Sequence, residues 1–148
     1  MKEFNKVSLR MVCEKTYEYN NTTICSTLDA VDFINQQEDI ADNAEENVYC
    51  IAMDNKNQII SFSQIAKGGT NLCNFDTKTL FKTILLCNAN KFILVHNHPS
   101  GDCTPSETDY ETTERIQDAS RLLGLALLDH IVVARNGYAS CRYNREVK

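Results

Sequence analysis

A short apolar run near the middle of the 148-residue chain constrains the fold more than any other feature. The run, Phe92-Ile93-Leu94-Val95, leads directly into His96-Asn97-His98-Pro99. An apolar run of this length is typical of a buried strand, and the proline ends it. We therefore expect a strand at residues 92–96 inside a sheet that has helices packed on its faces.

Hydrophobic spacing predicts the elements on either side of this strand. Helical spacing starts after Ser26, at Thr77–Asn88 and at Ser106–Leu123, where Gly124 follows. Short apolar runs predict strands, including two hairpins, at 48–53, 58–65, 127–134 and 138–141, and residues 7–16 alternate as an edge strand would. The order predicts an α/β fold, a single mixed-sheet domain with flanking helices. We expect it at residues 26–148, after an N-terminal strand or extension at 1–25.

Composition excludes several functional classes. With 43% hydrophobic and 24% charged residues the chain is typical of a globular protein, and its net charge of −5 gives no strong nucleic-acid signal. No apolar stretch is long enough for a membrane span, and none at the N-terminus resembles a signal peptide, so we expect a cytoplasmic protein. The seven cysteines include no C-x-x-C pair, which favours reduced, mostly buried thiols over a thiolate zinc site.

The two histidines after the apolar run suggest a metal site. Side chains two residues apart leave the same face of a strand, about 6.6 Å apart along it, so His96 and His98 can converge on one ion. Ser106 is a natural N-cap for the next helix, and Asp109 falls at its N3 position. Asp109 is thus either a capping residue or a third ligand. Two histidines and one carboxylate leave a fourth position open, as in catalytic zinc sites.

The spacing His96-x-His98-Pro99, then Ser106-x-x-Asp109, resembles the JAMM motif of JAB/MPN metalloproteins. The run from His96 to Ser106 is similar to the RadC-like branch of that family. Two later blocks, 122–124 and 128–131, share the likeness, which covers residues 26–143. The resemblance implies a JAB/MPN (cytidine-deaminase-like) architecture.

The resemblance also implies an activity: zinc held by His96, His98 and Asp109, with zinc-bound water attacking a peptide or isopeptide carbonyl. Ser106 would stabilise the oxyanion. Anchoring on Gly69-Thr70 puts Gln64 where JAMM enzymes hold a glutamate base, and an amide cannot accept a proton as a carboxylate does. The alternatives are therefore a metal-binding but catalytically weak module that acts in partner binding, or a DNA-repair-associated factor, as the family name suggests. A peptide or protein substrate is expected, and the oligomeric state stays open.

The remaining polar residues near the motif are weaker candidates. His130, on an apolar strand, is interpreted as a hydrogen-bonded core histidine. Asp102 fits a turn better than a ligand, and Cys103 is at most an occasional soft ligand. Glu45 and Glu46 are interpreted as solvated loop charges, which would reach the site only if the strand that carries the base has a different register.

Overall fold

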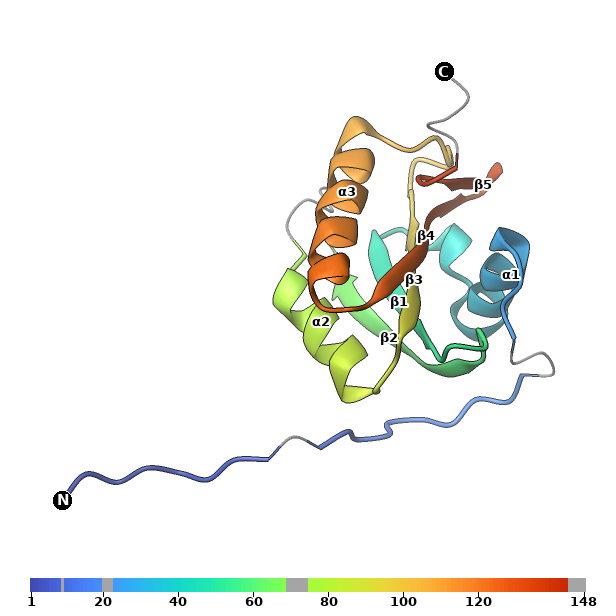
Figure 1. The fold of residues 1–148 in the computed structure, drawn as a ribbon. Helices are drawn as coiled ribbons and strands as arrows, with labels where there is room; N and C mark the ends of the chain where they lie inside the picture. Colours follow the sequence, from blue (N-terminus) through green and yellow to red (C-terminus); the bar gives the residue numbers. More distant parts are fainter. Residues whose placement is uncertain (9, 20–22, 69–74, 144–148) are drawn as a thin grey trace.

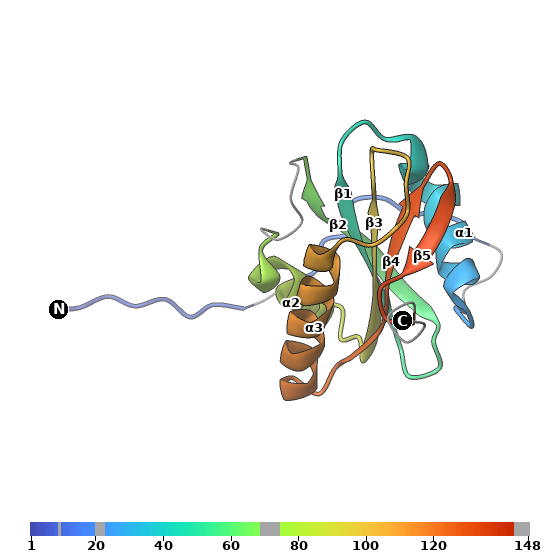
Figure 2. The same cartoon turned by 90° about the horizontal axis from the view of Figure 1, so that it is seen from above.

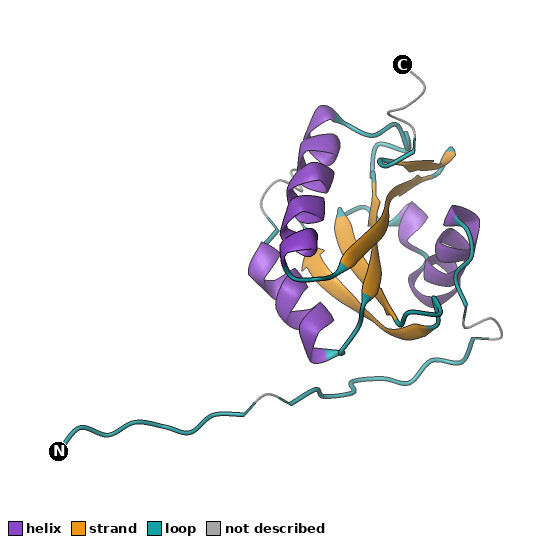
Figure 3. Ribbon diagram, in the orientation of Figure 1, coloured by secondary structure: helices purple, strands orange, loops and turns teal. Residues whose placement is uncertain are grey.

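The computed structural model of the protein describes residues 1–8, 10–19, 23–68 and 75–143. Its helices are α1 (Thr27–Glu38), η1 (Ile40–Asp42, a single 3-10 turn), α2 (Thr77–Leu86) and α3 (Glu107–Leu122). Its strands are β1 (Asn47–Met53), β2 (Ile59–Lys67), β3 (Lys91–Asn97), β4 (Ala126–Ala134) and β5 (Gly137–Ser140). Figure 1 and Figure 3 show these strands as one sheet with helices on both faces. The α/β class that the sequence predicts is confirmed.

The five strands lie in the order β2-β1-β3-β4-β5. Strand β3 is central: it pairs antiparallel with β1 on one side and parallel with β4 on the other. Helix α3 connects β3 to β4, as a parallel pair requires a crossover. The remaining pairs, β1 with β2 and β4 with β5, are antiparallel hairpins.

Alternation along the central strands builds a core on each face of the sheet. Val48, Cys50 and Ala52 of β1 pack with α2 and α3, whereas the intervening residues of that strand pack with α1. Both faces of the sheet are therefore covered by apolar side chains and shielded from water, which explains why β3 is apolar at successive positions. Figure 2 shows the sheet between α1 on one side and α2 with α3 on the other.

Two expectations about the N-terminal half are wrong. The described residues within 7–16 form no strand, and Val7 and Val12 are 84% and 79% exposed. Among the described residues before α1, Thr23 alone bridges to the sheet, at Gln58, so the described residues within 7–16 have no neighbouring strand to bury them. The acidic composition of residues 38–46 also predicts an exposed connection, but this segment contains η1, where Ile40 is fully buried.

None of the helices in the described part of the chain has the length and apolar character that crossing a bilayer requires.

The buried side chain of Asn97, at the end of β3, fastens the loop before β1. Its Oδ1 accepts the backbone N–H of Asn47 at 2.7 Å, and its Nδ2 donates to the carbonyls of Glu45 at 3.0 Å and Asn43 at 3.3 Å. These bonds satisfy the first N–H of β1 and two carbonyls of the loop before it.

We expect Asn97→Ala to lower the free energy of unfolding by about 1–3 kcal/mol, because buried backbone groups lose their partners. Urea unfolding followed by circular dichroism measures the change. Asn55→Ala, in the exposed turn between β1 and β2, is the matched control and should have little effect. Equal stability of the two variants would show that water replaces the Asn97 amide.

Candidate metal centre

Two histidines meet at the carboxyl end of β3. His96 is the sixth residue of the strand and is fully buried, and His98 follows directly after the strand, held by its backbone N–H on the carbonyl of Val133. Their Nε2 atoms lie 3.1 Å apart. The strand thus delivers both imidazoles to one point, as their spacing predicts.

Asp109 reaches the same point from the first turn of α3. Its Oδ1 lies 3.4 Å from Nε2 of His96, and its Oδ2 lies 3.3 Å from Nε2 of His98. The same carboxylate closes a capping box: Oδ2 accepts the N–H of Ser106 at 2.7 Å, while the Ser106 hydroxyl accepts the N–H of Asp109 at 3.2 Å. Asp109 therefore caps the helix and also faces both histidines.

A second carboxylate, that of Glu46, completes the cluster. Ligand atoms of Glu46, His96 and His98 all lie within 4.8 Å of one another, so these three residues could hold a metal ion. Glu46 precedes β1, and the antiparallel register that pairs Val48 with His96 brings it level with His98. The interpretation of Glu46 as a solvated loop charge is wrong, since it is half-buried beside the histidines.

The hydrogen bonds of His98 test whether the cluster suits a cation. Its Nδ1 lies 2.9 Å from the carbonyl oxygen of Asp102, which can only accept, so Nδ1 carries a proton. In the neutral ring, Nε2 therefore presents a lone pair toward His96 and Asp109. Acceptor atoms this close repel one another unless a cation, a proton or a metal ion, lies between them. The imidazole nitrogens and carboxylate oxygens that converge here are therefore suitable ligands for a metal ion.

Burial and pairing set the charges of the cluster. Burial lowers the pKa of His96 and keeps that ring neutral, whereas hydrogen bonding to Asp109 raises the pKa of His98. Burial alone would raise the pKa of Asp109, but its pairing with the imidazoles outweighs burial and holds that pKa well below its usual range. Burial raises the pKa of Glu46. The raised pKa of His98 favours a proton on that ring when no metal ion is bound.

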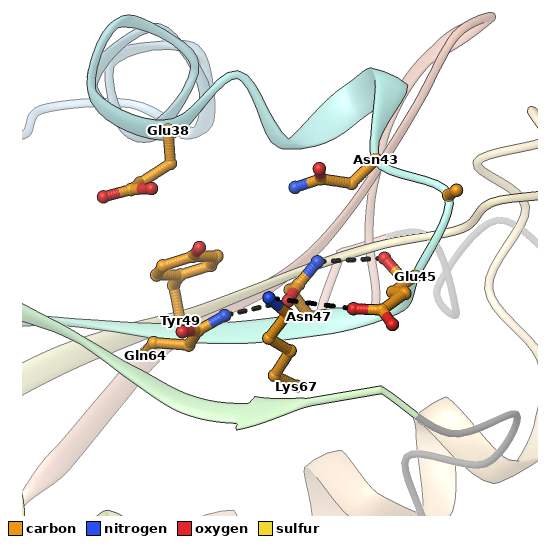
Figure 4. Close-up of a pocket in the computed structure, with 8 residues that line it drawn as sticks. Glu38, Asn43, Glu45, Asn47, Tyr49, Gln64 and Lys67 are labelled. Carbon is orange, nitrogen blue, oxygen red and sulfur yellow. Dashed lines mark hydrogen bonds and ion pairs between the residues drawn. The ribbon is translucent and has the colours of Figure 1, made fainter.

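Gln64 is not brought to this cluster. It pairs with Tyr49, whose side chain lies in the core on the α1 face, whereas His96 lies on the other face. Its Nε2 donates to Oδ1 of Asn47 at 2.8 Å, at the edge of a polar pocket beneath Glu38 (Figure 4). The predicted position of Gln64 beside the metal is therefore wrong. The anchor for that alignment, Gly69-Thr70, lies outside the described residues.

The weaker candidates occupy structural positions. Asp102 is a turn residue, as expected: its carboxylate accepts from Thr104 and Asn136, and only its carbonyl contacts His98. The backbone N–H of Cys103 donates to the side chain of Asn136, again within the turn.

His130, in β4, is buried and both its ring nitrogens have partners, as expected of a core histidine. One of those partners is His96, whose Nδ1 lies 2.9 Å from Nε2 of His130. His130 thus packs directly behind the cluster.

Comparison with known proteins agrees with this arrangement. The model of the family described as the RadC-like JAB domain matches residues 24–146. The chain belongs to the RadC-like JAB family.

Similar relatives, each described as a UPF0758 protein, come from several bacteria. The one from Finegoldia magna is 43% identical over 97 residues, which are 66% of this chain and 44% of the relative. The one from Thermotoga maritima is 39% identical over 102 residues, 69% of this chain and 46% of the relative. The one from Latilactobacillus sakei is 33% identical over 140 residues, 92% of this chain and 62% of the relative. This RadC-like chain therefore spans about half the length of the relatives it matches.

A comparison of two capping boxes in the described structure, those of α1 and α3, can separate capping from metal binding. Asp29 occupies the N3 position of α1 and accepts the N–H of Ser26 at 2.9 Å, as Asp109 does for Ser106 in α3. Within the described part of the chain the Asp29 carboxylate bonds only groups of Cys25 and Ser26 and no histidine, so Asp29 is a matched control for the capping role alone.

We expect Asp109→Asn to weaken zinc binding by more than about 100-fold, beyond what loss of an outer-shell partner causes, because the ligand charge is removed. Asp29→Asn should leave zinc binding unchanged. Both should cost about 1 kcal/mol of stability as capping residues. Chelator competition and thermal melting give the two quantities. If zinc affinity is the same in both variants, Asp109 is a cap and not a ligand.

Proposed function

We propose that this protein is a zinc-dependent hydrolase of peptide or isopeptide bonds. The observation that carries the proposal is the convergence of His96, His98 and Asp109 with a second carboxylate, Glu46, at one end of the sheet. Membership of the RadC-like JAB family supports it. The carboxyl end of a central strand is also where α/β sheets commonly have their binding sites.

The donor set suits zinc among the common metal ions. Imidazole nitrogen and carboxylate oxygen are frequent zinc ligands, and catalytic zinc sites commonly have three protein ligands. Zinc, when bound, polarises a carbonyl and lowers the pKa of water to about 7. In this proposal His96, His98 and Asp109 hold the ion, and the protein's other groups move the protons.

Glu46 is the proposed general base. Its carboxylate lies beside the histidines and is half-buried. Burial raises the pKa of Glu46, which makes it a better proton acceptor than an exposed glutamate. The Asn97 side chain, which bonds backbone groups on both sides of Glu46, keeps this carboxylate in place. Glu46 thus takes the role that the sequence alone suggested for position 64.

Ser106 is suited to stabilise a developing oxyanion. Its hydroxyl oxygen accepts the N–H of Asp109, so the position of Oγ is fixed by the helix cap. Accepting that bond leaves the hydroxyl proton available to donate to a substrate oxygen. Ser106 is exposed, so a substrate can reach it.

The case for a catalytically weak, partner-binding module rested on an amide in place of the base. Gln64 lies on the other face of the sheet, and the group beside the histidines is a carboxylate. No feature of the described residues favours the partner-binding alternative over hydrolysis. The DNA-repair alternative gains nothing from the charge of the chain, which is −5.

We expect Glu46→Gln to lower hydrolysis by about 10²–10⁴-fold while zinc content stays near that of the wild type, since a base is lost and the ligands remain. The assay uses zinc-loaded protein, a fluorogenic peptide library and lysine-isopeptide-linked peptides. Metal analysis of the same samples gives the zinc content. Glu45→Gln, which removes an exposed neighbouring carboxylate paired with Lys67, is the control and should remain active.

Two results would contradict this assignment in different ways. Loss of zinc from Glu46→Gln would make Glu46 a ligand instead of the base. Zinc-loaded wild type that cleaves none of the peptide or isopeptide bonds offered would refute the proposed hydrolase activity itself.

A further inference from the structure

We infer that Thr113 and His130 form a buried hydrogen-bond relay that fixes the tautomer of His96, so that its Nε2 lone pair faces the metal position. Both are positioning residues, which act on His96 through Nδ1, the ring nitrogen that does not face the metal position. The inference rests on the proposed metal site for its purpose, but the relay itself is read from contacts in the protein.

The relay starts at the backbone carbonyl of Asp109. Thr113 Oγ1 lies 2.7 Å from that carbonyl oxygen, and because a carbonyl can only accept, the Thr113 hydroxyl donates its proton there. Thr113 Oγ1 also lies 2.7 Å from Nδ1 of His130. Since its proton is already used, Thr113 accepts in this second bond, and His130 carries its proton on Nδ1.

The proton on Nδ1 of His130 fixes the direction of the bond between His130 and His96. A neutral His130 with its proton on Nδ1 has an acceptor lone pair on Nε2. That atom lies 2.9 Å from Nδ1 of His96, so His96 is the donor and carries its proton on Nδ1. His96 Nε2 is then unprotonated, and it points to Nε2 of His98 and Oδ1 of Asp109.

Burial removes the other protonation states. His96, His130 and Thr113 are 0%, 2% and 5% exposed, so each polar atom depends on its protein partner. Burial also disfavours an unpaired charge on either ring, so the neutral forms of His96 and His130 fit this environment. Moving the His96 proton to Nε2 would reverse every bond of the relay and take the Thr113 proton away from the Asp109 carbonyl.

A neighbouring thiol does not compete for this proton. Cys141 packs near Thr113, and burial raises the pKa of its thiol, so the thiol remains protonated. A protonated thiol is a donor and can add a bond to the Thr113 oxygen without taking the proton that Thr113 gives to Asp109.

The relay connects two of the proposed ligands, Asp109 and His96, through atoms that do not face the metal position. It begins at the residue that supplies the carboxylate, passes from α3 to β4, and ends on a histidine of β3. Metal-binding histidines usually have their second nitrogen fixed in this way, and losing such a partner costs about 10–100-fold in metal affinity.

The first test changes Thr113. Thr113→Val keeps the shape but removes the hydroxyl, so His130 is free to reverse; we expect zinc affinity, measured by chelator competition, to fall about 10–100-fold. Thr113→Ser restores the hydroxyl and should restore affinity. Thr112→Val is the matched control, because Thr112 is buried on the same helix and is not among the ring partners of His96 and His130 in the described structure.

The second test observes the tautomer in the metal-free protein, using ¹⁵N NMR of the histidine rings. Wild type and Thr112→Val should show His96 protonated on Nδ1, and Thr113→Val should show a shift toward protonation on Nε2. A wild-type His96 protonated on Nε2 would overturn the relay, whether or not Thr113→Val folds. So would a Thr113→Val protein with unchanged affinity and tautomer. Failure of the wild type to bind zinc would instead refute the proposed function and leave the NMR result to decide the relay.

Discussion

The double pairing of β3 is the constraint on which the rest of the structure depends. Its parallel partner β4 requires a crossover connection, which is α3. The first turn of α3 therefore lies beside the carboxyl end of β3. Its antiparallel partner β1 begins at the end where β3 finishes. One strand thus brings a helix N-terminus and the start of another strand to its own last residues. Asp109 and Glu46 reach the histidines by these two routes.

This topology also explains which parts of the site could be predicted from sequence. His96, His98 and Asp109 follow one another across a strand end, a turn and a helix cap, so local spacing was enough to group them. Glu46 is far from them in the sequence and joins them only through the β1–β3 register. The available signal was a glutamate two residues before an apolar run that can pair antiparallel with β3, but only the strand register shows that it contacts the histidines.

Gln64 shows why register is hard to derive. Successive side chains of a strand point to opposite faces, so an error of one residue exchanges the faces. The pairing of β1 with β2 shifts between Val48 and Tyr49, close to Gln64, and such a bulge changes the alternation. The fold class could be predicted because apolar runs and helix caps are local. The absence of a strand from the described residues within 7–16 could not be predicted, because an alternating pattern forms a strand only where a neighbouring strand can pair with it.

The candidate site combines stability and function in the same atoms. Oδ2 of Asp109 accepts the capping bond of α3 and also faces His98, while Oδ1 faces His96. Asp29 caps α1 in the same way without a histidine beside it in the described structure. A cluster of this kind is costly without a cation, because lone pairs and a carboxylate converge where water is excluded. The fold holds them together through backbone bonds: Asn97 fastens the loop of Glu46, the Asp102 carbonyl orients His98, and the Thr113–His130 relay orients His96. Each proposed ligand or base is thus fixed by a neighbour that is itself tied to the main chain, and preorganisation of this kind lets a site bind a metal ion without first rearranging.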